Sequence, residues 1–196
     1  KKQLKHLRIG YVASAFEDSV ASENDKASLK ILKSLGLELV PIELPEFPVE
    51  ALSFILTAEA AAAFDELTRT NKDDEMVRQV KNAWPNVFRD ARYIPAVEYI
   101  NANRARLLLN QKMAKLMETV DVYVIPSFYG DNLLRTNLTG HPCVVVPNGF
   151  NEKGTPTSIS FIGDLYEDGN VLAVAKAYQE VTDWHKQYPP KFKVNP

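Results

Sequence analysis

Leu7-Arg-Ile-Gly-Tyr-Val12 and Leu37-Glu-Leu-Val-Pro-Ile-Glu-Leu44 are two short apolar runs near the start of the chain, both rich in β-forming residues. Between them, the pair Asn24-Asp25 is suited to cap a helix, and Gly36 is a residue that commonly follows a helix end. The apolar residues at helical spacing between these two signals are Ala27, Ile31 and Leu35. Strand, helix and strand in so short a stretch predict a βαβ unit, whose right-handed crossover makes the two strands parallel.

The middle of the sequence has the composition of helices. We predict one helix over Glu50–Arg69, where alanine is frequent and neither glycine nor proline occurs. A second helix is predicted over Asp73–Ala83, with Trp84-Pro85 as its stop. Pro95 stands where a helix-opening proline belongs, and the apolar spacing after it predicts a helix of about two dozen residues, long against the usual length of about 11 or 12.

Six of the eight glycines fall between residues 130 and 169, so the composition changes there. Short β-forming runs bounded by turn residues predict strands over Asp121–Ile125, Cys143–Val146 and Thr157–Ile162. Apolar spacing predicts a last helix over Asn170–Trp184, and the tail beyond Tyr188 is expected to be loosely ordered. The whole order predicts an α/β fold, a single domain over residues 1–196 built as a three-layer α/β/α sandwich with a mixed β-sheet.

Composition excludes several classes of protein. Hydrophobic residues make up 45% of the 196 residues and charged residues 24%, values typical of a globular domain with an ordinary core. The formal net charge of −2 offers no positive field, and no apolar stretch reaches the roughly 18 residues of a spanning helix. We therefore expect no nucleic acid and no membrane as a partner. No signal peptide is visible, so localisation is unknown, with the cytoplasm as the default.

Motifs for cofactors, metals and common nucleophiles are absent from the sequence. It has no P-loop, no GxGxxG and no GxSxG, and its one cysteine and three separated histidines match no zinc spacing, so we expect no cofactor and no metal. His141 is interpreted as a turn histidine, with a general base as the alternative. Cys143 is expected to be a buried, inert thiol. Ser158 and Ser160 share one side of a strand, where they line a polar cleft or pack under a helix.

One region is difficult to explain as scaffold alone. It runs from Thr136-Asn-Leu-Thr-Gly-His-Pro142 through a valine-rich run and Pro147-Asn-Gly149 to Gly154-Thr-Pro-Thr-Ser-Ile-Ser-Phe-Ile-Gly163. This order resembles the C-terminal part of the amidase signature family, in which an Asn-Leu-x-Gly-x-Pro segment precedes a valine-rich strand, a Pro-x-Gly turn, Gly-x-Pro and a strand ending in Ile-Gly. Asp121-Val-Tyr-Val-Ile-Pro-Ser127 resembles the family's preceding strand, and Arg8-Ile-Gly-Tyr11 a mid-chain strand. The resemblance covers residues 7 to 185.

The resemblance implies an enzyme that hydrolyses or transfers carboxamides with a Ser–cis-Ser–Lys triad inside a Gly/Ser-rich stretch. This sequence has no such stretch, and in the family those residues precede the equivalent of residue 7. The chain therefore resembles the C-terminal portion of an amidase, without catalytic residues of its own. The resemblance implies that this portion supplies strands of a shared sheet and part of the acyl-side pocket. Its expected partners are a small-molecule amide substrate and the missing N-terminal half.

The same resemblance names candidate binding residues. Asp131 corresponds to an acidic residue that, in the glutamine-using branch, helps hold the substrate's amino group. Arg89 and Arg92 fall in the region that supplies an arginine for the substrate carboxylate. Solvated surface charges are the competing interpretation for all three. The motif residues expected to support the pocket are Thr136, Asn137, Gly140 and Pro142.

Two other functions remain open. The chain is alternatively a stand-alone α/β small-molecule binding module, whose βαβ unit forms a ligand crevice at the carboxyl ends of its strands. It is also interpretable as a docking module of a larger complex. Because a sheet cut from its neighbours keeps an unpaired edge and an uncovered apolar patch, we further expect self-association.

Overall fold

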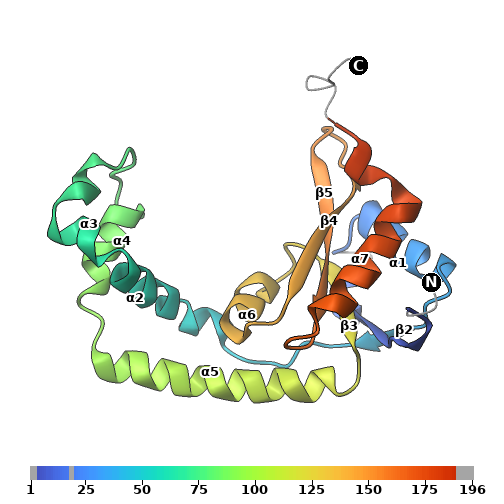
Figure 1. The fold of residues 1–196 in the computed structure, drawn as a ribbon, viewed down its shortest axis with the longest axis horizontal. Helices are drawn as coiled ribbons and strands as arrows, with labels where there is room; N and C mark the ends of the chain where they lie inside the picture. The colour runs from blue at the N-terminus through green and yellow to red at the C-terminus, as the bar shows by residue number, and fades with distance from the viewer. Residues whose placement is uncertain (1–3, 18–19, 189–196) are drawn as a thin grey trace. The chain divides into compact units, whose positions relative to one another are not determined.

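The computed structural model describes residues 4–17 and 20–188, so the tail predicted beyond Tyr188 lies outside the described residues (Figure 1). The strands are β1 Ile9–Val12, β2 Leu39–Ile42, β3 Val122–Pro126, β4 Cys143–Phe150 and β5 Pro156–Gly163. The helices are α1 Glu23–Ser34, α2 Phe54–Ala63, α3 Asp65–Arg69, α4 Trp84–Ala91, α5 Ala96–Met117, α6 Asn132–Thr139 and α7 Asp168–Thr182. None of the helices in the described ranges has the length and hydropathy needed to cross a membrane.

The five strands form one mixed sheet in the order β2-β1-β3-β5-β4. β1 pairs in parallel with β2 and β3, whereas β5 pairs antiparallel with β3 and β4. The predicted βαβ unit is therefore confirmed, with α1 as its crossover helix. β4 and β5 form a hairpin whose register shifts between Pro147 and Gly149.

Helices cover both faces of the sheet. α1 and α7 lie on one face, where Leu32 of α1 and Tyr178 of α7 belong to the same buried cluster as Val124 and Phe161 (Figure 1). On the other face, the hydroxyl of Tyr123 in β3 donates to Asn132 of α6 over 2.9 Å. Because neighbouring strand residues point to opposite faces, α6 lies across the sheet from α1 and α7. The three-layer α/β/α architecture with a mixed sheet is confirmed.

α1 begins with a capping box. The Ser22 hydroxyl accepts from the Asp25 N–H, and the Asp25 carboxylate accepts from the Ser22 N–H, which satisfies donors that a helix start leaves free. At the other end, Leu35 is the C-cap and Gly36 follows with φ +81°. Glycine takes this left-handed conformation without a Cβ penalty, so the predicted stop is confirmed.

Residue contacts group the chain into two compact units. The sheet unit comprises residues 1–46 and 111–196, and the helical unit comprises residues 47–110. In the helical unit, Phe88 of α4 is buried and stacks on Phe64 with ring centroids 5.5 Å apart. The single domain expected over residues 1–196 stays a prediction.

The helical unit departs from the sequence predictions in its first half. The single helix predicted over Glu50–Arg69 is divided into the 3₁₀ turn η3 Val49–Leu52, α2 and α3. Phe64 separates α2 from α3, with φ −105° and ψ 23°. The long helix predicted after Pro95 is confirmed as α5, which has 22 residues.

The helix predicted over Asp73–Ala83 is wrong. A short 3₁₀ turn, η4 Lys72–Glu75, ends there, and Met76 is extended with ψ 136°. The Gln79 side-chain amide donates to the carbonyls of Asp73 and Met76 at 2.9 and 2.8 Å, so it takes up groups that a helix would use. Pro85 lies in the first turn of α4 and starts this helix, because a proline there loses no helical hydrogen bond.

Gly163, the last residue of β5, lies directly against α7. A Cβ at this position would lie 2.2 Å from Cγ2 of Val171, which is fully buried. Gly163→Ala is therefore expected to lower the free energy of unfolding by about 1–3 kcal/mol, because a well-packed contact has to open. Urea denaturation measures this, with Gly169→Ala as control, since a Cβ at Gly169 meets nothing within 4 Å. Equal midpoints for Gly163→Ala and wild type would contradict the packing.

β4 is an edge strand with exposed side chains. Val145 is 55% exposed, and Cys143 is exposed, so the prediction of a buried thiol is wrong. An edge strand has a neighbour on one side only, which leaves its groups less covered.

We predict that the chain self-associates through β4. Val145→Lys should reduce self-association, because a charged residue on an edge strand opposes pairing with a second chain. Light scattering over a concentration series measures the effect. Val181→Lys is the control, since Val181 is 53% exposed but lies on α7. A wild-type chain that stays monomeric at every concentration would refute the prediction.

Candidate functional site

The segment from Asp131 to Pro142 combines a short helix with the start of an edge strand. Where the sequence indicated polar turns, the structure has α6, which Gly140 ends with φ +80°. The hydroxyls of Thr136 and Thr139 donate to helix carbonyls of Leu133 and Arg135, at 3.1 and 2.9 Å. Short polar side chains that are common in turns thus bond back to the helix here, and the sequence pattern does not separate these two uses.

Asp131 precedes α6 and is held by an arginine one turn later. Arg135 donates through Nε and Nη2 to the two carboxylate oxygens of Asp131, at 3.2 and 3.0 Å. Its Nη1 donates to the Pro45 carbonyl at 2.9 Å. The Arg135 side chain is 4% exposed and that of Asp131 26%. Arg135 therefore ties α6 to the segment after β2. Sequence analysis missed this residue, although acid and arginine four residues apart on a helix were the available signal.

The four motif residues are distributed around α6. Thr136 is buried, whereas Asn137 and Gly140 are exposed. The Pro142 carbonyl accepts from the Gly163 N–H at 3.0 Å, which joins the start of β4 to the end of β5. Their support of a substrate pocket stays a prediction.

Arg89 and Arg92 lie in the helical unit and are paired there. Arg89 Nη2 lies 2.6 Å from Asp73 Oδ2 and 2.5 Å from Asp74 Oδ1. Arg92 pairs with Asp65, whose pKa is held below its usual value first by the Arg69 hydrogen bond and further by Arg92. Both cations therefore have carboxylate partners within their own unit. Their predicted binding of a substrate carboxylate stays a prediction.

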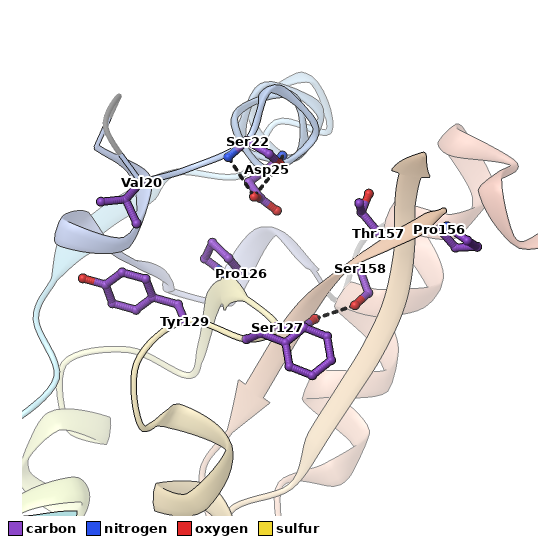
Figure 2. Close-up of a pocket in the computed structure, with 10 residues that line it drawn as sticks. Val20, Ser22, Asp25, Pro126, Ser127, Tyr129, Pro156, Thr157 and Ser158 are labelled. Carbon is purple, nitrogen blue, oxygen red and sulfur yellow. Dashed lines mark hydrogen bonds between the residues drawn. The ribbon is translucent and has the colours of Figure 1, made fainter. Parts of the chain in front are cut away.

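A pocket of about 410 Å³ lies in the sheet unit, at the carboxyl end of β3 (Figure 2). The first turn of α1 borders it on one side and the first residues of β5 border it on another. Ligand sites of α/β sheets commonly occur at the carboxyl ends of parallel strands, and β1 and β3 are parallel. The volume falls within the range of about 300–1,000 Å³ typical of small-molecule sites.

Three serine hydroxyls meet beside this pocket. Ser127 directly follows β3, and Ser158 and Ser160 point to one side of β5. Oγ of Ser158 and Oγ of Ser160 donate to Ser127 Oγ at 2.9 and 3.0 Å. Ser127 and Ser158 line the pocket, which supports the polar-cleft interpretation of the β5 serines, whereas Ser160 is buried behind them.

Asp25 faces the pocket from α1. Its Oδ2 accepts from the N–H and hydroxyl of Ser22 at 3.0 and 2.6 Å, and its Oδ1 accepts from Asn148 Nδ2 at 3.0 Å. Among the ten described residues that line the pocket, Asp25 is the only charged one. Sequence analysis assigned Asp25 to a helix cap and missed that the same carboxylate borders a cavity.

His141 lies apart from the pocket, near the end of β5. Its ring is buried, Nδ1 lies 2.8 Å from Thr139 Oγ1, and Nε2 lies 3.9 Å from Asp164 Oδ1. Burial lowers the pKa of His141, and the attraction of Asp164 opposes this effect. A neutral, enclosed imidazole agrees with the interpretation of a turn histidine.

A family model described as Amidase matches residues 1–133. Among curated proteins, the chain is 27% identical to one of the subunits of the glutamyl-tRNA(Gln) amidotransferase of Rippkaea orientalis, over 95% of this chain and 48% of that protein. It is 28% identical to the protein of the same name from Thermosynechococcus vestitus, over 96% of this chain and 48% of that protein. The chain thus spans about half the length of these relatives.

Solved structures show the same fold. The native peptide amidase of Stenotrophomonas maltophilia superposes with a TM-score of 0.77 and 21% identity, covering 97% of this chain and 45% of that one. A bacterial aryl acylamidase gives a TM-score of 0.73 and 15% identity, covering 93% of this chain and 45% of that one. At these identities the likeness concerns the arrangement of helices and strands.

Removal of Arg135 should destabilise the sheet unit. Arg135→Ala leaves the Asp131 carboxylate and the Pro45 carbonyl without their donor, so we expect a loss of about 2–4 kcal/mol in the free energy of unfolding. Guanidinium denaturation measures the loss. Lys26→Ala, which removes a cation whose ion pair with Glu23 lies at the surface of α1, is the control and should cost under about 1 kcal/mol. A loss for Arg135→Ala no larger than for the control would contradict the role given to the buried pair.

Proposed function

Because this chain belongs to the amidase signature family, we propose that it is the C-terminal portion of an enzyme that hydrolyses carbon–nitrogen amide bonds. The observation that carries the proposal is the family match, which includes β1, α1, β2, the helical unit and β3. In the proposed reaction, water cleaves the amide C–N bond to give a carboxylic acid and an amine or ammonia.

The proposal divides the work between this chain and the rest of the enzyme. The resemblance to the family implies a Ser–cis-Ser–Lys triad in a Gly/Ser-rich stretch, and no such stretch occurs in these 196 residues. The relatives are about twice as long as the part that this chain matches, which leaves room for that stretch. We propose that the nucleophile and its base come from that other part.

This chain would then contribute scaffold and substrate binding. The pocket lies where β3 ends and α1 begins, so the sheet fixes two of its sides. The Asp131–Arg135 pair holds α6 against the segment after β2, and this pair is the structural use we assign to a candidate binding residue. A chain of this kind orients an amide without activating a nucleophile itself.

A stand-alone binding module is the second candidate. The specific observation in its favour is the pocket at the carboxyl ends of the parallel strands, which is the crevice that a βαβ unit creates without any further domain. The two candidates differ in one respect: an amidase portion needs a nucleophile from elsewhere, and a binding module needs none. A continuous reading frame upstream that encodes a Gly/Ser-rich stretch would favour the amidase.

The purified chain should not hydrolyse amides. Its pocket holds three serines but no lysine or histidine among the described lining residues, so no hydroxyl there has a base to activate it. Ammonia release from simple carboxamides measures this, with a buffer blank as the reference. Turnover above the blank that survives repurification and is lost in Ser127→Ala would overturn the division of work.

A further inference from the structure

The pocket beside the serine cluster combines one free hydroxyl donor with one carboxylate. Ser127 Oγ accepts from both Ser158 and Ser160, which occupies its two acceptor positions. Its own hydrogen has no acceptor among the described residues, and Ser127 lines the pocket. A bound molecule with a carbonyl oxygen would satisfy this donor.

The Asp25 carboxylate supplies the complementary acceptor. A carboxylate has about four acceptor positions, and three are used by Ser22 and Asn148. Figure 2 shows the carboxylate directed toward the space that Ser127 and Ser158 border. The remaining position can accept from an N–H group of a bound molecule.

The charge of the pocket selects against anions. No lysine, arginine or histidine is found among its described lining residues, and Asp25 adds a negative charge. The partial positive charge at the start of α1 is already faced by Glu23 and Asp25. An anionic ligand would lose its hydration and gain no countercharge, whereas a neutral ligand avoids this cost.

The remaining walls are apolar. Pro126, Phe128 and Tyr129 form the loop after β3, and Val20 and Pro156 lie at the other borders. Phe128 is 88% exposed, an unusual state for a large apolar side chain beside a cavity. Aromatic and proline surfaces of this kind pack well against a flat apolar body.

We propose that this pocket binds a neutral carboxamide with an apolar, preferably aromatic, body and discriminates against carboxylates. The amide carbonyl accepts from Ser127, an amide N–H donates to Asp25, and the body packs on Pro126 and Phe128. The proposal rests on the proposed function and deepens it, because it gives the class of amide that the enzyme would take. It also separates this chain from a site for free amino acids, whose carboxylate needs a cation.

Phenylacetamide and phenylacetate test the proposal, since they share size and shape and differ in charge. Ligand-observed NMR on the purified chain measures the two dissociation constants. We expect phenylacetamide to bind at least about tenfold more tightly than phenylacetate, the effect of one unfavourable charge. Ser127→Ala should weaken phenylacetamide roughly fivefold to tenfold, the effect of one hydrogen bond. Ser34→Ala, whose hydroxyl donates to Ile31 at the end of α1, should leave binding unchanged.

A charge-reversed variant keeps the test independent of folding. Phe128→Arg changes an exposed side chain and places a cation at the pocket, so phenylacetate should now bind more tightly than it does to wild type. No binding of phenylacetamide, equal binding of both compounds to wild type, or an unchanged Phe128→Arg preference would overturn the proposal. Amide selectivity in an enzyme that releases no ammonia would leave this inference standing and refute the proposed function, and turnover without selectivity would do the reverse.

Discussion

The attachment of the first turn of α1 to the β4–β5 hairpin is the constraint on which the pocket depends. Asn24 donates through Nδ2 to the Phe150 carbonyl and to Thr157 Oγ1, at 3.0 and 2.9 Å. One residue later, Asp25 accepts from Asn148. Gly149 makes the close approach possible, because a Cβ there would lie 2.8 Å from the Asn24 side chain and its φ is +143°. These contacts join residues more than a hundred positions apart and set the distance between the walls of the cavity.

The same attachment connects helix capping to binding. Asp25 closes the capping box of α1 and also presents its carboxylate to the pocket, so one side chain both starts the helix and sets the charge of the site. The arginines that could balance a negative ligand are used elsewhere. Arg135 is bound to Asp131 and Pro45, and Arg89 is paired with Asp73 and Asp74. The described part of the site therefore favours neutral molecules.

Local signals predict the sheet better than the helical unit. The β1–α1–β2 unit, the three later strands and α7 follow from apolar runs, a cap and glycine stops, each of which acts within a few residues. The helix predicted over residues 73–83 does not form, and the Gln79 side-chain bonds that replace it there have no sequence pattern of their own. α6 is hidden in the sequence because its threonines bond back to the helix. The pocket needs tertiary structure, since Ser22, Ser127 and Ser158 meet only when the sheet forms.

The central claim is that this chain binds an amide and leaves the nucleophilic chemistry to residues outside it. Its most direct test is treatment of the purified chain with a fluorophosphonate, which modifies activated serines, followed by mass spectrometry of the peptides. The account predicts an unmodified chain, because Ser127 and Ser158 have hydrogen-bond partners but no described base. A single adduct on Ser127, Ser158 or Ser160 would contradict it and place the nucleophile in this pocket.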